Sequence, residues 1–216
     1  RIALGTLGYA QLLGEAQRAA RVLAARGVAR GDHVAIVLPA GEDFAVALHG
    51  CLLLGAVAVP IDPLVPAAER ARRTAACVVV VDGRLAGDAD PAAALGAAHD
   101  LDAPAVVIHT SGTSADARPV TLTYGNWLWS ALGSAVALGL DAEERWLCCL
   151  PVAHVGGLSI LVRSAIYGTT ALVHERFETD RVLAALRDPG GPTLISLVPA
   201  TLGRLLDAGL REPPAL

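Results

Sequence analysis

Residues 105–127 read AVVIHTSGTSADARPVTLTYGNW, and this stretch combines an apolar run, a polar loop and a second apolar run. Its first five residues are all but continuously apolar and predict a buried strand that ends at His109. A polar loop with four hydroxyl side chains around one glycine follows, at Thr110, Ser111, Gly112, Thr113 and Ser114. Exposed backbone N–H groups in a turn, together with hydroxyl donors, form an anion-binding concavity. Glycine lets the backbone approach a ligand closely.

Arg118 follows a few residues later and supplies a guanidinium that can bind an anion with two hydrogen bonds. Strand, loop and arginine together suit a polyphosphate. From the residues alone, an ordinary polar turn is an equal alternative, because Ser/Thr-rich loops often follow strands. The nucleotide-binding patterns G-x-x-x-x-G-K and G-x-G-x-x-G are both absent from the sequence.

Outward from this loop, short apolar runs alternate with longer amphipathic stretches. The pattern predicts helices at 9–26, 42–54, 66–76, 124–138, 157–167, 178–188 and 200–208. It predicts strands at 33–38, 56–59, 77–81, 105–109, 120–123, 145–150, 170–174 and 193–198. Residues 87–103 lack a clear period and are expected to form a surface excursion. The alternation indicates an α/β fold of layered, mostly parallel sheets flanked by helices, with ligands at the carboxyl ends of the strands.

Composition excludes several classes of protein. The 216 residues are 54% hydrophobic, enough for a sizeable core, and the longest apolar runs are too broken to span a membrane. All 17 basic residues are arginine and the net charge is −4, so we expect no nucleic-acid partner. The four cysteines lie in apolar runs without metal or disulfide spacing, which favours a reducing, cytoplasmic location. We also expect no metal site, because His33, His49, His99 and His174 show no ligand spacing.

Three segments resemble the adenylate-forming enzymes, the acyl-CoA synthetases and their relatives. Residues 109–126 resemble the family's phosphate loop T-S-G-T-T-G-x-P-K-G-V followed by L-T-H-x-N. Residues 27–35, GVARGDHVA, match G-V-x-x-G-D-x-V-A, and residues 55–63, GAVAVPIDP, match G-A-V-x-V-P-x-D-P. The three matches follow the family's order and span most of the chain. Within the family, residues 150–159 (LPVAHVGGLS) and 163–170 (RSAIYGTT) look most like the 2-succinylbenzoate–CoA ligases of menaquinone biosynthesis.

The resemblance implies an ATP-dependent ligase. A carboxylate would attack the α-phosphorus of ATP to give an acyl-adenylate, and the thiol of CoA would then displace AMP. By resemblance, the loop residues 110–114 would cradle the β- and γ-phosphates, Mg²⁺ would bridge phosphate oxygens, and Arg118 would occupy the family's lysine position. His154 would orient the reacting carboxylate. The partners would be small molecules, with a homo-oligomer as a possibility.

Three more residues belong to the acyl-pocket segment 150–168 that the resemblance implies. Succinylbenzoate has two carboxylates, and Arg163 either binds the one that is not activated or reaches from its helix to water. Gly156 and Gly157 either leave room for the aromatic ring or allow close packing. His154 alternatively caps or packs against a helix.

The loop departs from the family pattern at three positions. Ala115 replaces a glycine, Asp116 adds a negative charge, and Ala117 replaces a proline. Two alternatives therefore stay open: a ligase for another aryl or fatty acid, and a degenerate module that binds a nucleotide without catalysis. Because no methionine and none of the family's downstream segments are present, we expect residues 1–216 to be part of an N-terminal adenylation domain, with phosphate loop 109–120, and to be inactive alone.

Overall fold

The computed structural model describes residues 1–110 and 118–211. Two five-stranded sheets form its frame. The first sheet has the order β5-β3-β4-β6-β7, with bounds Val79–Val81, His33–Ile36, Val57–Pro60, Pro104–Thr110 and Arg118–Thr123. The second has the order β10-β8-β9-β1-β2, with bounds Leu194–Ile195, Arg145–Cys148, Thr170–Val173, Ile2–Leu4 and Leu7–Gly8. All pairings are parallel except β6 with β7 and β1 with β2.

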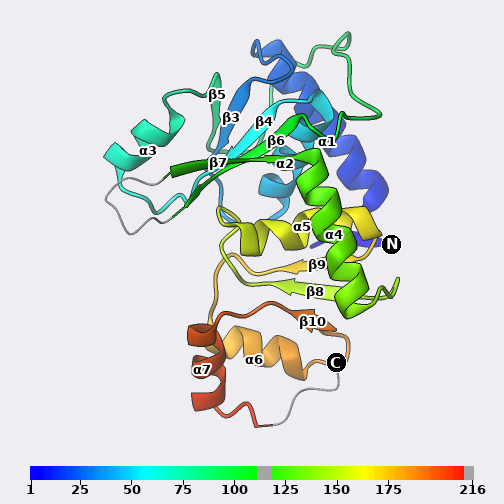
Figure 1. Cartoon of the computed structure of the whole chain (residues 1–216), viewed down its shortest axis with the longest axis vertical. Coiled ribbons are helices and arrows are strands. Elements are labelled where there is room, and N and C mark those ends of the chain that lie inside the picture. Colours follow the sequence, from blue (N-terminus) through cyan, green and yellow to red (C-terminus); the bar gives the residue numbers. More distant parts are fainter. Residues whose placement is uncertain (111–117, 212–216) are drawn as a thin grey trace.

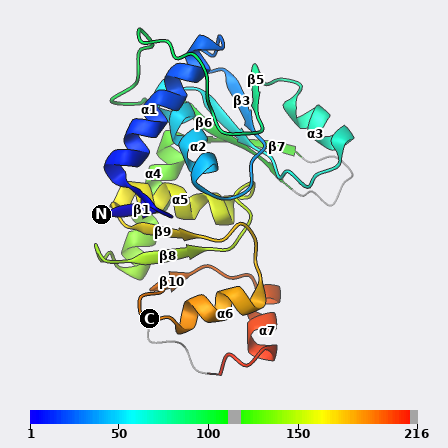
Figure 2. The same cartoon turned by 180° about the vertical axis from the view of Figure 1, so that it is seen from behind.

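Seven helices in the described chain cover these sheets in layers. Their bounds are α1 Tyr9–Ala25, α2 Glu42–Leu54, α3 Ala67–Thr74, α4 Tyr124–Leu138, α5 Val155–Tyr167, α6 Thr179–Arg187 and α7 Pro199–Asp207. In Figures 1 and 2, α5 lies between the two sheets, α3 lies beside the first sheet, and α6 and α7 lie beyond the second. The result is the layered α/β fold that the sequence predicts.

Three hydrophobic clusters match these layers. The largest joins both sheets through α1, α2 and α5, because it contains Ile36 of β3, Trp146 of β8 and Leu158 of α5. Alternate residues of the same strands point the other way. Val59 and Val107 therefore belong to a small cluster on the outer face of the first sheet, whereas the outer face of the second sheet packs on α6 and α7.

The helix predictions are confirmed to within a few residues, because they rest on apolar stripes that the fold buries. In α1, Leu12, Ala16, Ala19 and Leu23 recur at helical spacing and are all buried. Helix α2 ends at Gly55, whose φ of +76° is favourable for glycine. Residues 87–103 contain no helix or strand and lie against α1 and α2, since the Asp90 N–H donates to the Arg21 carbonyl (3.0 Å) and the Gly96 N–H to the Leu53 carbonyl (2.7 Å).

Two features of the second sheet differ from expectation. Strands β1 and β2 were not expected, because two or three residues are too few to show a period; β1 is held instead by parallel pairing of Leu4 with Ala171 of β9. Strand β10 covers two residues rather than the six expected at 193–198.

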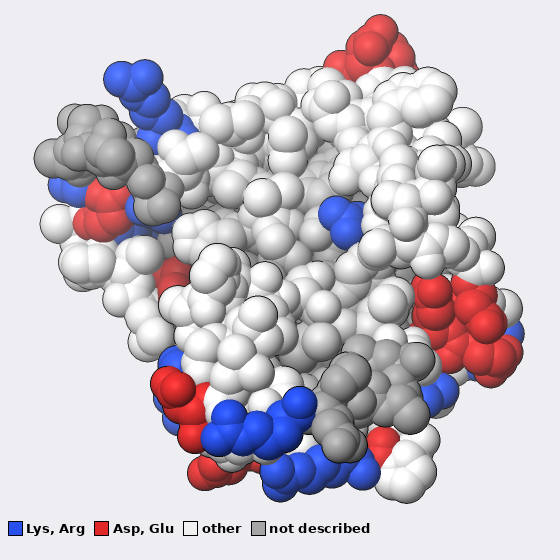
Figure 3. Space-filling view, turned by 60° about the horizontal axis from the view of Figure 1, so that its bottom comes forward, with Lys and Arg blue, Asp and Glu red and all other residues white. Residues whose placement is uncertain are grey.

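No described helix is long and apolar enough to cross a membrane. On the face shown in Figure 3, charged side chains gather toward the margins and the middle is largely uncharged.

Candidate functional site

A crevice opens where strands of both sheets reach their carboxyl ends. Its volume is about 450 Å³, and the loops after β3, β4, β8 and β9 line it, at residues 38–40, 62–64, 149–153 and 175–177. Loops at the carboxyl ends of parallel strands are where open α/β sheets bind their ligands. Most of the lining is apolar or proline, with Asp62, Glu175 and Arg176 as its charged members. The crevice therefore suits a largely apolar ligand with a polar end.

His154 directly follows Ala153, a residue that lines this crevice, and immediately precedes α5. Its backbone is extended (φ −114°, ψ 153°), and its carbonyl accepts from the Leu158 N–H at 3.0 Å. The side chain is exposed and makes no capping hydrogen bond to α5. Among the described residues, the His154 side chain therefore neither caps α5 through a hydrogen bond nor is buried in the core. The imidazole is free to meet a ligand.

The two glycines that begin α5 differ in their surroundings. A Cβ at Gly157 would lie 2.5 Å from the carbonyl oxygens of both Leu150 and Pro151. A Cβ at Gly156 would meet Leu150 Cδ1 at 3.2 Å. Close packing of α5 on the loop after β8 therefore accounts for Gly157. Gly156 is partly exposed, so a ligand can reach it.

The ends of the predicted phosphate loop are held by a hairpin. Thr110 ends β6, Arg118 begins β7, and the two residues are direct partners in the antiparallel register. The Thr110 hydroxyl donates to the Arg118 carbonyl at 3.3 Å, and both residues are exposed. Ser111, Gly112, Thr113 and Ser114, together with the departures at 115–117, lie outside the described residues. The hairpin thus places the termini of this loop at the carboxyl end of β6.

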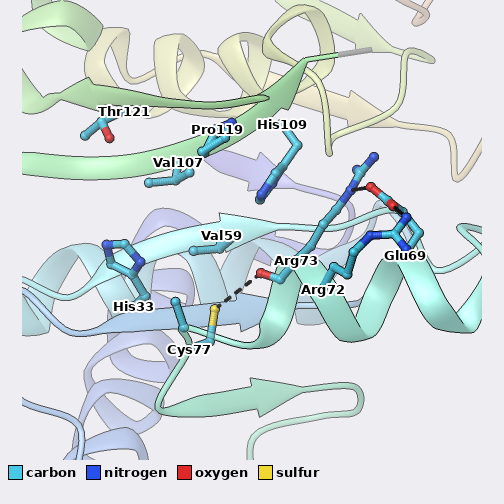
Figure 4. Close-up of a pocket in the computed structure, with 11 residues that line it drawn as sticks. His33, Val59, Glu69, Arg72, Arg73, Cys77, Val107, His109, Pro119 and Thr121 are labelled. Atoms are coloured by element: carbon cyan, nitrogen blue, oxygen red, sulfur yellow. Dashed lines mark hydrogen bonds and ion pairs between the residues drawn. The ribbon is translucent and has the colours of Figure 1, made fainter. Parts of the chain in front are cut away.

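His109, the first residue of the expected loop segment, faces a different cavity. Figure 4 shows its ring pointing into a space of about 480 Å³ between α3 and the outer face of the first sheet. Burial, and then the nearby Arg73, lower the pKa of His109. Glu69 in α3 accepts from Arg73 at 2.7 Å and also pairs with Arg72, and these bonds lower the pKa of its carboxyl. Glu69 thus pairs with both arginines, and the three side chains together carry one net positive charge at the edge of this cavity.

Arg163 lies apart from His154 on α5. Nine residues separate them, or about 13 Å along a helix axis. The guanidinium lies 5.3 Å from the centre of the Trp146 ring, and Nη1 donates to Ser134 Oγ at 3.4 Å. Trp146 itself is buried, with 4% of its surface exposed. The contacts of Arg163 with Trp146 and Ser134 join α5 to β8 and α4, and no pattern in the sequence predicts them.

Two of the other histidines pack within the described structure. His99 stacks on Tyr124 with 4.1 Å between ring centres. Burial lowers the pKa of His49 to about 4. Among residues 1–110 and 118–211, no group of three His, Cys, Asp or Glu side chains could hold a metal ion.

The chain matches the family described as AMP-binding enzyme over residues 3–99 and 73–215. It is 32% identical to the 2-succinylbenzoate–CoA ligase of Bacillus subtilis over 98% of this chain and 47% of that one, and 33% identical to the Bacillus licheniformis enzyme over 97% and 48%. The chain thus spans about half the length of the curated relatives it matches.

Solved structures give the same result. Among them, o-succinylbenzoate coenzyme A synthetase from Bacillus subtilis in complex with AMP superposes with a TM-score of 0.90 at 32% identity, over 100% of this chain and 62% of that one. The same protein with ATP and a magnesium ion gives 0.90 at 33%, over 100% and 50%. Together with the family match across almost every residue, this shows that the chain belongs to the AMP-binding enzyme family.

Proposed function

We propose that the protein containing this chain is an AMP-forming acid–thiol ligase that converts 2-succinylbenzoate to its CoA thioester. The observation that carries the proposal is the 0.90 TM-score, over the whole chain, to a synthetase solved with AMP. The related structure in complex with the acyl-adenylate intermediate supports the two-step order. The crevice at the strand ends, whose lining includes Ala153 next to His154 in the chain, offers a place for the acid.

The reaction has two displacements. In the first, a carboxylate oxygen of the acid forms a bond to the α-phosphorus of ATP, the bond from that phosphorus to the bridging oxygen breaks, and pyrophosphate leaves. In the second, the sulfur of CoA bonds to the acyl carbon, the thiol proton passes to solvent, and AMP leaves. The protein's contribution is to position the reactants and to neutralise developing charge.

We assign the phosphates to the loop that the β6–β7 hairpin holds. Thr110, Ser111, Gly112, Thr113 and Ser114 would donate to the β- and γ-phosphates, and Arg118 would add a positive charge. Two residues of this set are described, and both are exposed at the carboxyl end of β6. Mg²⁺ would neutralise phosphate oxygens. It would be carried by the triphosphate.

We assign the acid to the residues around α5. His154 would orient the reacting carboxylate, and the partly exposed Gly156 would leave room for the ring, whereas Gly157 seats α5 against the loop after β8. Arg163 would bind the second carboxylate. Its support is a buried Nε without a hydrogen-bond partner and the lack of any ion pair to Arg163 in residues 1–110 and 118–211.

The test is acid-dependent release of pyrophosphate by the natural protein that contains this chain. We expect 2-succinylbenzoate to give a higher kcat/KM than benzoate or a medium-chain fatty acid. The variant Arg163→Ala is expected to raise the KM for 2-succinylbenzoate by about tenfold, the effect of a lost charge-assisted hydrogen bond. The exposed Arg187 of α6 provides the matched control, Arg187→Ala. A preference for benzoate or a fatty acid would instead support a ligase for another acid.

A degenerate module is the second candidate, and Ala115, Asp116 and Ala117 favour it. The discriminating experiment restores the family pattern with Ala115→Gly, Asp116→Arg and Ala117→Pro, followed by measurement of ATP affinity. A large gain in affinity together with an inactive parent protein supports the degenerate module. An unchanged affinity together with an active parent supports an enzyme that tolerates its loop.

We also propose a cytoplasmic location, on the state of the cysteines. All four thiols are free, and Cys51, Cys148 and Cys149 are buried. Burial raises the pKa of Cys51 and Cys148 to about 12, so these thiols behave as small apolar groups. Free thiols of this kind fit a reducing compartment.

A further inference from the structure

The surroundings of Arg163 are almost free of acceptors. Its Nη1 donates to Ser134 Oγ at 3.4 Å, and its Nε is buried without a partner. No acidic side chain of the described residues forms an ion pair with it. A half-buried guanidinium has five N–H donors, so this one keeps most of its donor capacity for a ligand.

Trp146 supplies the main contact that holds this guanidinium. The ring centre lies 5.3 Å from Arg163 Cζ, within the range of a cation–π interaction. Because β8 is a central strand, between β10 and β9, the ring comes from a rigid part of the sheet. Trp146 is 4% exposed. The platform under Arg163 is therefore fixed by the core of the molecule.

Ser196 accepts a hydrogen bond from the indole nitrogen of Trp146. The Trp146 indole Nε1 donates to Ser196 Oγ at 3.1 Å, in the segment that follows β10. This bond restrains rotation of the indole about its side-chain torsions. Arg163 is in turn held between the ring and Ser134 of α4. Ser196, Trp146, Arg163 and Ser134 thus form a continuous chain of contacts.

We infer that Trp146 is a positioning residue for the acid substrate: it holds the Arg163 guanidinium in place to bind the carboxylate that is not activated. The inference rests on the proposed function and deepens it, because it names the residue that makes the site selective for acids with two carboxylates. An aliphatic side chain in place of the ring offers the cation no attraction. Arginine side chains in such a setting turn their charge toward water, and the site then loses its preference for a second carboxylate.

The experiment compares two acids in the natural protein that contains this chain. They are 2-succinylbenzoate and 4-oxo-4-phenylbutanoate, which lacks the ring carboxylate. We expect Trp146→Leu to reduce the ratio of their kcat/KM values about tenfold, because the KM for 2-succinylbenzoate rises. The KM for ATP should not change. Trp146→Phe keeps an aromatic face and should retain most of the ratio, and Ser196→Ala, which removes the anchor alone, should give a smaller loss.

A purely structural role gives a different result. If Trp146→Leu lowers kcat/KM for both acids equally, or if Trp146→Phe loses as much of the ratio as Trp146→Leu, the positioning role is wrong. Should Trp146→Leu fail to fold, Trp146→Phe and Ser196→Ala decide the matter. An unchanged ratio in Ser196→Ala together with a full loss in Trp146→Phe contradicts an aromatic platform.

A binding measurement separates this inference from the proposed function. In the natural protein that contains this chain, Trp127, Trp129 and any tryptophan outside residues 1–216 are replaced by Phe, and the emission of Trp146 is recorded while 2-succinylbenzoate is added. We expect a saturable change that Arg163→Ala abolishes. If the protein activates no acid but shows this change, the proposed function fails and the inference stands. If it is active and Trp146 gives no response, the inference fails and the proposed function stands.

Discussion

The packing of Gly157 allows a sharp test of how α5 is seated. The change is Gly157→Ala. The added Cβ would lie 2.5 Å from two carbonyl oxygens, about 0.9 Å inside an ordinary contact of 3.4 Å. Both oxygens belong to backbone, at Leu150 and Pro151, so they cannot rotate away as a side chain does. Either α5 or the loop after β8 must move.

The magnitude follows from two opposing effects. Overpacking a well-packed site costs about 1–3 kcal/mol. Alanine in place of glycine in a helix returns about 0.5–1 kcal/mol. We therefore expect Gly157→Ala to lower the free energy of unfolding by about 1–2 kcal/mol, and the melting temperature by about 2–4 °C for each kcal/mol in a chain of this size.

Gly156→Ala is the matched control, one residue away on the same helix. Its Cβ would meet the end of the Leu150 side chain at 3.2 Å, which a small rotation relieves. This variant should range from neutral to about 1 kcal/mol more stable. Urea unfolding, followed by circular dichroism, measures both variants. Equal stabilities of Gly156→Ala and Gly157→Ala would refute the claim that the carbonyls of the loop determine how α5 packs.

Three further predictions concern other parts of the core. Gly14→Ala in α1 should stabilise the fold by about 0.5–1 kcal/mol in urea unfolding, because a Cβ there meets nothing within 4 Å in the described structure. Tyr9→Phe should cost about 1–2 kcal/mol in the same assay, because the Tyr9 hydroxyl shares its proton between the carbonyls of Ser164 (2.7 Å) and Thr169 (2.5 Å) and so joins α1 to α5 and to the turn before β9. The free energy of unfolding should fall as the pH is lowered from 6.5 to about 4. Burial lowers the pKa of His49 to about 4, so in this range the unfolded chain binds a proton that the folded chain does not.

The His49 effect amounts to at most about 3 kcal/mol for a shift of this size. The variant His49→Gln should remove this part of the pH dependence, measured as urea midpoints at pH 7, 6, 5 and 4.5. A parallel decline in His49→Gln and the parent would assign the acid sensitivity to other groups. For Tyr9→Phe, a change below 0.3 kcal/mol (a rough limit of such measurements) would mean that water replaces the hydroxyl without cost.

The site could be anticipated in part. Thr110 and Arg118 were expected at a ligand loop, and the β6–β7 hairpin places them as direct partners. His154 was expected to orient the reacting carboxylate; it follows Ala153, which lines the crevice, and its role stays a prediction. These positions follow local rules: a strand end, a glycine-containing loop and a helix start. The two explanations for Gly157 could be separated only with coordinates, because its neighbours are carbonyls seven and six residues away in the chain.

The order of helices and strands was determined by the sequence itself. Buried strands are apolar along their length and covering helices are apolar on one face, so their patterns are legible within ten or fifteen residues. The tertiary structure decided which distant pieces meet. Strand β1 pairs with β9, and the cation of Arg163 rests on the ring of Trp146 from another element. Such contacts depend on how sheets and helices stack. The two partners of each contact lie far apart in the sequence, and the energy of one contact is small, so neither produces a local sequence pattern.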